Sequence, residues 1–329
     1  MTETRERSER VEREARVFDD VVAEVGKVLV GQRALVERLL LGLLCDGHVL
    51  LEGVPGIAKT LAVEALARTL AVQFKRIQFT PDLLPSDVLG TPVYQPAKGT
   101  FEVRRGPIFT NLLLADEVNR APAKVHAALL EAMAERKVSL DGVDHALPQP
   151  FLVLATQNPI EQEGTYPLPE AALDRFFLKV KVDYPTFDEE REIVARQATT
   201  AKKPELRVIA SAERLLEARA LVDAIYVDDR LVRYALAIVR ATREPKAAGF
   251  DDLADAMRFG ASPRASIALV LAARGHALLR GRAFASPADI KAIAHDVLRH
   301  RIQPSYAAEA QGIDADAIVT KLLDRTEIP

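Results

Sequence analysis

The chain contains no tryptophan and only 5% aromatic residues, and Cys45 is its single cysteine among 329 residues. With so few aromatic rings, we expect an aliphatic, helix-rich core. One cysteine cannot form a disulfide within the chain, and its place inside an apolar run predicts a buried thiol. The single cysteine fits the cytoplasmic location that we expect.

The sequence also lacks a strong excess of one charge and a long hydrophobic run. The formal net charge of −3 gives no reason to expect a general nucleic-acid binder. The first residues, MTETRERSERVEREAR, mix acids and bases without the apolar stretch of a signal peptide, which predicts a charged helix or tail. The longest apolar stretch, near residues 39–45, is far too short to cross a bilayer, so we expect no membrane partner.

What the chain does contain is an alternation of short apolar runs and helical patterns. Apolar residues make up 49% of a length that suggests two domains. Short apolar runs bounded by turn residues are typical of buried parallel strands, and helical patterns between them favour an α/β sheet. The runs are His48–Glu52, Phe74–Phe79, Leu112–Asp116, Phe151–Thr156 and Phe177–Val182. We therefore predict the α/β class, with a five-stranded parallel sheet followed by an all-α domain.

The strand patterns stop after Tyr184-Pro185. The next residues, Thr186-Phe187-Asp188-Glu189, form a capping box that predicts the start of a helix, and the pattern stays helical to about Arg325. The predicted organisation is a charged N-terminal segment over residues 1–27, an α/β core over residues 28–185 and a helical domain over residues 186–329. Four histidines show no metal-ligand spacing with cysteines or acids and are expected at the surface or in packing; they are His126, His276, His295 and His300.

The octet GVPGIAKT, Gly53–Thr60, follows the first apolar run and resembles a phosphate-binding loop. The usual pattern has glycine where Ala58 stands. A helix beginning near Lys59 would offer free N–H groups and a positive dipole end to phosphate, Lys59 would reach the outer phosphates, and Thr60 would offer its hydroxyl to Mg²⁺. We expect Ala58 in the first helical turn with an ordinary helical φ, where a methyl group costs little. A plain strand-to-helix turn is the alternative. The nucleotide-binding residues predicted here are Gly53, Val54, Pro55, Gly56, Ile57, Ala58, Lys59, Thr60 and Leu61.

Acidic and amide side chains follow two further strands. The stretch NLLLADEVNR ends an apolar run with Asp116 and Glu117. A carboxylate there can hold Mg²⁺ through water, and its neighbour can polarise an attacking water; a solvated pair of acids is the alternative. In VLATQNP, Asn158 can orient that water from the opposite side, unless it only forms an Asn-Pro turn.

Two arginines have an unusual setting. Arg175 lies between acidic and aromatic residues in PEAALDRFF, and Arg264 follows Ser262 and Pro263 in GASPRAS. Ser262 has the features of an N-cap and Pro263 of a first helical residue. This arrangement places Arg264 in a first helical turn, where a cation opposes the helix dipole and an anionic partner such as a phosphate would suit it. An ion pair with a neighbouring acid is the alternative for Arg175, and a surface position without a role is the alternative for Arg264.

The ordered set GVPGIAKT, LLLADEVNR, ATQNP, LDRF and SPRA resembles AAA+ ATPases. More narrowly, GPIFTNLLLADEVNRAPAKVHAALLEAM and ATQNPIEQEGTYPLPEAALDRF are similar to the MoxR family, in which alanine before the loop lysine is usual. This resemblance implies ATP and Mg²⁺ as cofactors, Lys59 with Thr60 as the Walker A pair, and Asp116 with Glu117 as Walker B. Asn158 matches sensor 1. The α/β core and the helical domain would then be the ATPase core and its lid.

The resemblance also assigns roles outside the phosphate loop. Arg175 matches the arginine finger, which acts on the nucleotide of the next subunit, and Arg264 matches sensor 2 on the lid. Gly31 and Gln32 resemble the segment that lines the adenine pocket. Gln78, at the end of the second strand, matches a polar residue that restrains Glu117 until a partner binds.

A finger acting on a neighbour implies a ring of copies of this chain, usually a hexamer. The family resemblance further implies a chaperone-like activity on a client enzyme complex, with a separate von Willebrand factor A domain protein as partner. Two insertions, Thr91–Val103 with strand-like flanks and Lys137–Phe151 with an Asp141-Gly142 hairpin signal, are candidates for loops that contact substrate; inert surface hairpins are the alternative. There are three competing functions. They are a motor on nucleic acid, a subunit resembling that of magnesium chelatase, and a non-catalytic nucleotide-binding scaffold. We consider nucleic acid an unlikely partner.

Overall fold

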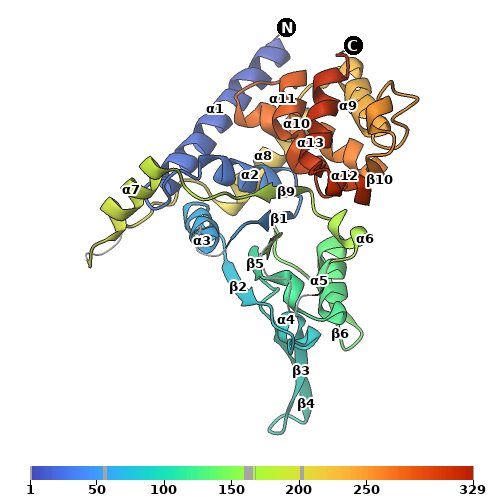
Figure 1. The fold of residues 1–329 in the computed structure, drawn as a ribbon. Helices are drawn as coiled ribbons and strands as arrows, with labels where there is room; N and C mark the ends of the chain where they lie inside the picture. Colours follow the sequence, from blue (N-terminus) through green and yellow to red (C-terminus); the bar gives the residue numbers. More distant parts are fainter. Residues whose placement is uncertain (1, 55–57, 159–165, 167, 201–203, 329) are drawn as a thin grey trace. The chain divides into compact units, whose positions relative to one another are not determined.

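The computed structural model describes residues 2–54, 58–158, 166, 168–200 and 204–328 (Figure 1). The chain forms two compact units. We call the first the α/β unit; it consists of Asp20–Phe176 and Val180–Leu216. We call the second the helical unit; it consists of Met1–Asp19, Phe177–Lys179 and Glu217–Pro329. This division by packing differs from the ranges 1–27, 28–185 and 186–329 drawn from the sequence pattern, which stay a prediction of domain organisation.

The predicted five-stranded parallel sheet is confirmed, with the strand order β2-β5-β8-β1-β9. Its strands are β1 (Val49–Glu52), β2 (Phe74–Gln78), β5 (Leu112–Asp116), β8 (Leu152–Gln157) and β9 (Leu178–Lys181). The inner strands are almost wholly apolar because both of their faces are covered. The register places Gln78 beside Asp116 and Ala115 beside Ala155, so the carboxyl ends of these neighbouring strands meet at one edge of the sheet.

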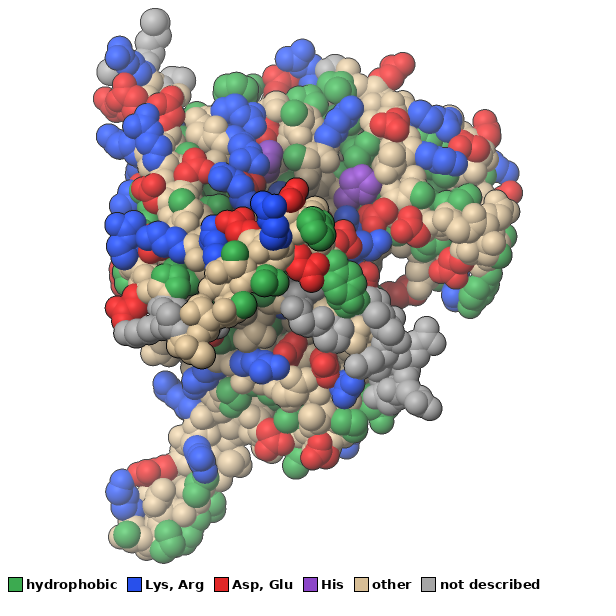
Figure 2. Space-filling model, turned by 60° about the vertical axis from the view of Figure 1, so that its left-hand side comes forward, with side chains coloured by type: hydrophobic (Ala, Val, Ile, Leu, Met, Phe, Trp, Pro, Cys, Tyr) green, Lys and Arg blue, Asp and Glu red, His purple; other side chains and the backbone are tan. Residues whose placement is uncertain are grey.

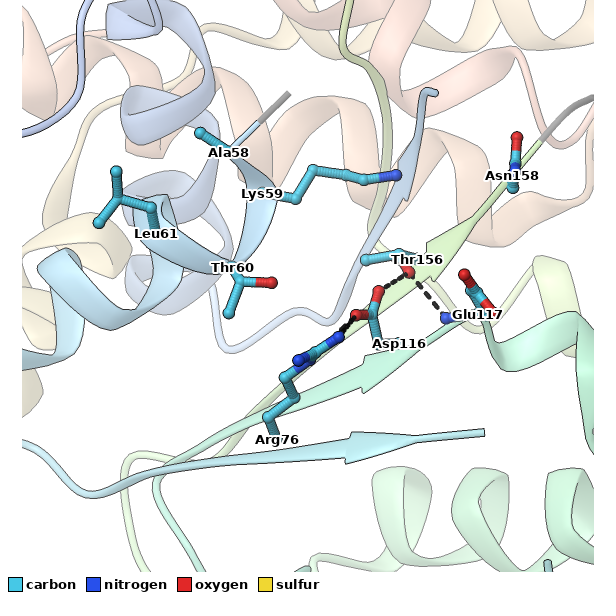
Figure 3. A pocket seen from close by; sticks show the side chains of 9 residues that line it. All are labelled: Ala58, Lys59, Thr60, Leu61, Arg76, Asp116, Glu117, Thr156 and Asn158. Carbon is cyan, nitrogen blue, oxygen red and sulfur yellow. Dashed lines mark hydrogen bonds and ion pairs between the residues drawn. The ribbon is translucent and has the colours of Figure 1, made fainter. Parts of the chain in front are cut away.

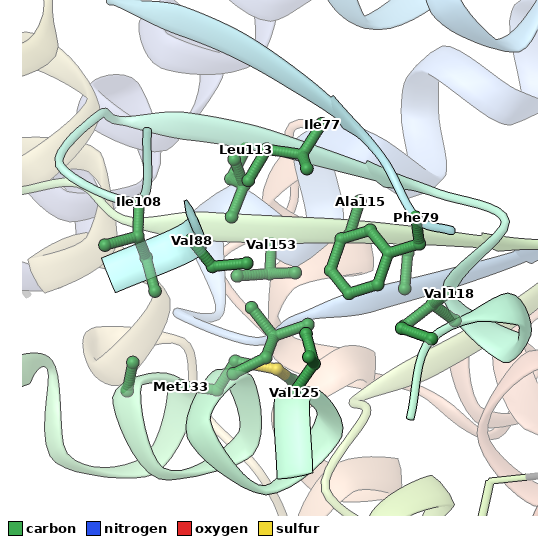
Figure 4. Packing of buried hydrophobic residues seen from close by; sticks show 14 of the residues in the cluster. Ile77, Phe79, Val88, Ile108, Leu113, Ala115, Val118, Val125, Met133 and Val153 are labelled. Carbon is green, nitrogen blue, oxygen red and sulfur yellow. The ribbon is translucent and has the colours of Figure 1, made fainter. Parts of the chain in front are cut away.

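The helices of the α/β unit are α2 (Arg33–Leu44), α3 (Lys59–Thr69), α4 (Pro85–Leu89), α5 (Ala123–Glu135), α6 (Glu170–Leu173) and α7 (Phe187–Gln197). Helices α3 and α5 bury apolar faces in the core beside the sheet, whereas α7 buries none of its residues. Val125 and Met133 of α5 point toward Leu113 and Val153 of the sheet, as Figure 4 shows. These side chains belong to a large aliphatic cluster in which Phe79 is fully buried, so the predicted aliphatic core is confirmed.

Both predicted insertions form hairpins. The first pairs β3 (Gly90–Gln95) with β4 (Thr100–Arg105), and the second pairs β6 (Lys137–Leu140) with β7 (Val143–Ala146). Asp141 and Gly142 have φ of 52° and 75°, as a tight hairpin turn requires. The β3–β4 hairpin projects from the rest of the α/β unit, at the bottom of Figures 1 and 2. Tyr94 and Phe101 pair across it with ring centroids 5.3 Å apart, and both are largely exposed.

The helical unit consists mainly of α9 (Asp229–Ala241), α10 (Pro263–Leu279), α11 (Pro287–Leu298), α12 (Tyr306–Ala310) and α13 (Ala315–Arg325). Helix α1 (Thr2–Val25) contributes its first part to this unit, and α8 (Ala212–Ala224) contributes its last part. The prediction of helices alone in this part of the chain is wrong in one respect, because a short antiparallel ribbon pairs β10 (Met257–Phe259) with β11 (Gln303–Pro304). These strands are too short to give a periodic pattern.

A buried carboxylate joins α10 to α11. Asp289 caps the start of α11 with Ser286 and also accepts hydrogen bonds from Arg282 and His276. Burial alone would raise the pKa of Asp289, but these donors lower it well below its ordinary value. Across the described residues, no helix combines the length and the apolar character needed to cross a membrane.

Candidate active site

A cavity of about 410 Å³ lies where α3 begins and where β5 and β8 end (Figure 3). Its lining side chains are Ala58, Lys59, Thr60, Leu61, Arg76, Asp116, Glu117, Thr156 and Asn158. Ligands of parallel α/β sheets bind outside the carboxyl ends of the strands. The fold therefore brings seven residues that the sequence singled out into one pocket, together with Arg76 and Thr156, which it did not.

Lys59 is the first residue of α3, and its side chain extends across the pocket in Figure 3. Its Nζ donates a hydrogen bond to the carbonyl of Gly53 over 2.6 Å. Burial lowers the pKa of Lys59, while the negative charges of Asp116 and Glu117 act in the opposite direction. A partly desolvated ammonium at a helix start, where N–H groups lack intrahelical partners, suits an anionic ligand.

The backbone of Ala58 contradicts our expectation of an ordinary helical φ. Ala58 has φ 59° and ψ 24° and lies in the left-handed region as the N-cap of α3. A residue with a Cβ pays about 1–2 kcal/mol for this conformation, which explains why glycine is the usual residue at this position. Gly53 continues the sheet by donating to the carbonyl of Gln157, and Val54 follows it. Three further predicted loop residues, Pro55, Gly56 and Ile57, lie outside the described residues.

Thr156 connects the two acidic residues. Its hydroxyl donates to Asp116 Oδ1 over 2.6 Å and accepts from the backbone N–H of Glu117 over 2.8 Å. Glu117 itself has a left-handed backbone, with φ 55°, which turns the chain sharply at the end of β5. The sequence signal for Thr156 was present but weak, because it is a hydroxyl residue in an apolar run, two residues before Asn158.

Three further polar side chains hold the two carboxylates. Arg76 contacts Asp116 Oδ2 through Nη2 at 2.6 Å and through Nε at 3.0 Å. The amide Nε2 of Gln78 donates to Glu117 Oε2 over 2.9 Å, so the predicted neighbours do meet. Arg120 Nε lies 2.9 Å from the same Glu117 oxygen. The sequence pattern did not indicate Arg76 and Arg120, although Arg76 precedes Gln78 by two residues and must share its face of the strand.

His126 supports the turn that follows Glu117. Its Nε2 donates to the carbonyl of Val118 over 2.6 Å, and the side chain is buried. Burial lowers the pKa of His126, and the hydrogen bond to Val118 partly opposes that shift. His126 is thus a packing residue. This is one of the two roles that we predicted for the histidines, the other being a surface position.

Asn158 and Arg175 have different settings. Asn158, directly after β8, lines the pocket and is 7% exposed. Arg175 donates through Nη1 to the carbonyl of Leu130 over 2.9 Å and lines a second cavity of about 380 Å³ between α5 and α6. Arg175 and Lys59 of the same chain therefore line different cavities, and Arg175 is not among the residues that line the pocket around Lys59.

The remaining predicted residues lie elsewhere. Arg264 belongs to the helical unit, in the first turn of α10 as expected, and its backbone N–H donates to the capping hydroxyl of Ser262 over 3.2 Å. Gly31 has φ 75°, a left-handed conformation that favours glycine over residues with a Cβ. Gln32 is the N-cap residue of α2.

The donor set of the pocket fits Mg²⁺ but not a metal held by protein alone. Among the described residues, no group of three or more His, Cys, Asp or Glu side chains could hold a metal ion. Mg²⁺ is usually bound by one or two carboxylates together with substrate phosphates and water. The pocket offers one carboxylate, that of Asp116, and one hydroxyl, that of Thr60, as oxygen ligands for the metal.

Comparison with known proteins agrees with this geometry. The family model described as "ATPase family associated with various cellular activities (AAA)" matches residues 48–178, and the model of the AAA lid domain matches residues 251–322. The fold is that of an AAA ATPase domain followed by a helical lid domain. "Chaperone MoxR1" of Mycobacterium tuberculosis is 48% identical over 316 residues, which cover 96% of this chain and 83% of that protein. "Protein MoxR" of Paracoccus denitrificans is 35% identical over 322 residues, covering 93% and 94%. The chain belongs to the MoxR family of AAA+ ATPases.

A solved structure matches the whole fold. It is the crystal structure, at 2.00 Å resolution, of a protein from Cytophaga hutchinsonii ATCC 33406. Its TM-score is 0.92 at 45% sequence identity, and the alignment covers 100% of this chain and 98% of the other.

Proposed function

We propose that the protein hydrolyses ATP with Mg²⁺ and uses the reaction to remodel a client protein complex. The observation that carries the hydrolytic part is the pocket of Figure 3, where Lys59, the Asp116–Glu117 pair and Asn158 converge at the start of α3. A cation, two carboxylates and an amide at the end of a parallel sheet are the side chains that phosphoryl transfer to water requires.

In this proposal each side chain has one task. Lys59 and the first N–H groups of α3 bind the phosphates, and Arg264 adds positive charge from the helical unit. Thr60 and Asp116, the latter through water, hold Mg²⁺, which when bound neutralises charge on the β- and γ-phosphates. Glu117 accepts a proton from the attacking water while Asn158 orients that water.

Assembly into a ring, with six subunits as the family resemblance implies, is part of the proposal. The position of Arg175 supports it, because this arginine does not line the pocket of its own α/β unit. In a ring, Arg175 of one subunit would stabilise charge that develops on the γ-phosphate held by the next. A residue of this kind contributes roughly 10³-fold or more to the rate.

A chaperone-like role on an enzyme complex, with a von Willebrand factor A domain protein as partner, completes the proposal. It is supported by the similarity to a protein named "Chaperone MoxR1", of which the chain spans 83%. A cytoplasmic location is proposed as well, in keeping with a sequence whose single cysteine, Cys45, is buried.

Two variants test the hydrolytic part. Lys59→Ala is expected to abolish binding of a fluorescent ATP analogue, whereas Glu117→Gln should bind it normally and release phosphate very slowly. Unchanged affinity in Lys59→Ala would remove the phosphate-loop assignment. Phosphate release by Glu117→Gln at the wild-type rate would remove the role of Glu117.

The client is identified by capture with a trapped ATPase. Glu117→Gln, loaded with ATP in its native cell, should retain a von Willebrand factor A protein and its enzyme partner, while Lys59→Ala serves as the unloaded control. Retention of nucleic acid with replication proteins, or of chelatase subunits, would overturn the chaperone role and leave the ATPase assignment intact.

A further inference from the structure

Arg76 has two contacts with the carboxylate that the proposed function assigns to magnesium. Its Nη2 and Nε lie 2.6 and 3.0 Å from Asp116 Oδ2 (Figure 3). The other oxygen, Oδ1, accepts the Thr156 hydroxyl over 2.6 Å. Each oxygen of Asp116 therefore already has a donor from the α/β unit itself, and the net charge of the Arg76–Asp116 pair is zero.

A guanidinium in this place competes with a divalent cation. Waters of a hydrated Mg²⁺ would donate to the same carboxylate, and two cations beside one carboxylate repel each other. The guanidinium of Arg76 has room to move away from Asp116, because the side chain of Arg76 is 48% exposed whereas that of Asp116 is only 14% exposed.

The same guanidinium fixes the neighbouring amide. Arg76 Nη2 also donates to Gln78 Oε1 over 2.9 Å. With its oxygen facing Arg76, the Gln78 amide presents Nε2 to Glu117 Oε2, again over 2.9 Å. Arg120 Nε lies 2.9 Å from that same carboxylate oxygen. An oxygen that already receives two donors is poorly placed to accept a proton from an attacking water.

We propose that Arg76 is a displaceable cation, which holds Asp116 and, through Gln78, Glu117 in an inactive arrangement until Mg²⁺ arrives with the nucleotide. Displacement of the guanidinium from Asp116 removes the partner that orients the Gln78 amide, so binding of the metal releases Glu117 for the reaction. Arg76 is thus a positioning residue for a site whose ATPase activity is itself the proposed function.

The first test measures how much Mg²⁺ the protein needs to bind a nucleotide. A fluorescent, non-hydrolysable ATP analogue is held at fixed concentration and MgCl₂ is titrated against wild-type protein, Arg76→Ala and Lys75→Ala. Lys75 is the matched control, since it is an exposed cation one residue earlier on β2, on the opposite face of the strand. Arg76→Ala should reach half-saturation at about two- to fivefold lower Mg²⁺, the size expected for loss of one partly exposed ion pair.

A second readout uses EDTA in place of Mg²⁺. Without Arg76, the uncompensated charge of Asp116 should repel the phosphates, so Arg76→Ala should bind the analogue more weakly than wild type in EDTA. Lys75→Ala should match wild type in both conditions. An Mg²⁺ midpoint in Arg76→Ala that equals or exceeds the wild-type value overturns the inference.

The outcome also separates this inference from the proposed function. A wild-type chain that binds no nucleotide with Mg²⁺ overturns both, whereas normal wild-type binding with an unmoved midpoint in Arg76→Ala overturns only the role of Arg76. The link to Glu117 is tested by combining Arg76→Ala with Gln78→Ala. Each single variant should raise basal phosphate release, and the double variant should raise it no further. Multiplicative effects would show that the two side chains act independently.

Discussion

Thr156 Oγ1 donates a hydrogen bond to Asp116 Oδ1 over 2.6 Å, from one inner strand of the sheet to its neighbour. The same oxygen accepts the backbone N–H of Glu117, so one hydroxyl orients the proposed metal carboxylate and the turn that carries the proposed base. The ends of these strands thereby fix the Asp116 carboxylate and the turn at Glu117 relative to each other before any ligand binds.

Thr156→Val should damage this arrangement without changing side-chain volume. It leaves a partly buried N–H and one carboxylate oxygen without the Thr156 hydroxyl as partner, which costs about 1–3 kcal/mol. We expect phosphate release to fall roughly tenfold or more, since a misplaced general base loses its contribution. The measurements are steady-state phosphate release and urea unfolding. Thr156→Ser keeps the hydroxyl and should retain most activity; equal loss in both variants would mean that the methyl group matters instead.

The left-handed backbone of Ala58 predicts opposite effects for two substitutions. Ala58→Gly removes a conformational penalty of about 1–2 kcal/mol, so the nucleotide-free protein should be as stable as wild type or more stable. Ala58→Val puts a β-branched residue at φ 59° and should destabilise it. Thermal unfolding without nucleotide checks both. A less stable Ala58→Gly would show that the entropy gained by the unfolded chain outweighs the relieved strain.

Mixing two inactive variants tests whether Arg175 acts on a neighbouring subunit. Arg175→Ala lacks the arginine finger but keeps an intact nucleotide pocket. Glu117→Gln has a defective pocket but keeps the arginine finger. Mixed rings contain some interfaces where an intact pocket meets an intact finger, so part of the activity should return. Phosphate release is measured across mixing ratios, with Lys59→Ala plus Glu117→Gln as the control in which no interface contains an intact pocket. No recovery in rings proven to be mixed would contradict the assignment.

Glu24 predicts a pH-dependent part of the stability. Its side chain is only 1% exposed and accepts from Lys27 and from the backbone and guanidinium of Arg207. Hydrogen bonds from Arg207, and then from Lys27, lower the pKa of Glu24 from 4.5 to about 2. A depressed pKa means that the carboxylate stabilises the fold above pH 4.5 and loses this effect as the pH falls toward 2.

Wild type should therefore exceed Glu24→Gln in urea midpoint at pH 7, and the difference should shrink as the pH falls from 4.5 toward 2. The exposed pair between Arg68 and Glu64 provides the control, because Glu64→Gln should have little effect at any pH. A difference between wild type and Glu24→Gln that stays constant with pH would contradict the role of the charged form.

Tyr234 predicts a variant that is at least as stable as wild type. The residue is fully buried in α9, its hydroxyl has no hydrogen-bond partner among the described residues, and burial raises the pKa of the phenol. Tyr234→Phe removes an unsatisfied polar atom and should stabilise the fold by up to about 1–2 kcal/mol, seen as a higher melting temperature. Tyr306→Phe, at a 79% exposed position, should not change it. A lower melting temperature for Tyr234→Phe would mean that the hydroxyl has a partner after all.

The sequence predicted the parts of this protein that depend on local pattern. Inner strands of a parallel sheet are buried on both faces, so their apolar runs stood out, and Asp141-Gly142 marked a hairpin because its turn needs two positive φ values. The backbone of Ala58 could not be predicted in the same way. Its positive φ is a property of the backbone at the start of α3, and an alanine gives no local sign of it.

Arg76 and Thr156 were missed for a different reason. Each looks unremarkable in its own strand, and their meeting at Asp116 depends on the register between three strands that are far apart in the sequence. Gln78 was found only through the family resemblance, and the structure places it against Glu117.

The distribution of charge over the sheet has a consequence for solubility. Among the five strands, lysine and arginine occur only in β2, with the sequence FKRIQ, and in β9, with the sequence LKVK; the three strands between them have none. These two strands are the edges of the sheet, and unpaired backbone groups at an edge can recruit a strand from another molecule. At β9 the carbonyls of Phe177 and Lys179 accept hydrogen bonds from Arg301 and Arg299. Positive side chains at both edges further disfavour edge-to-edge pairing between copies of the chain.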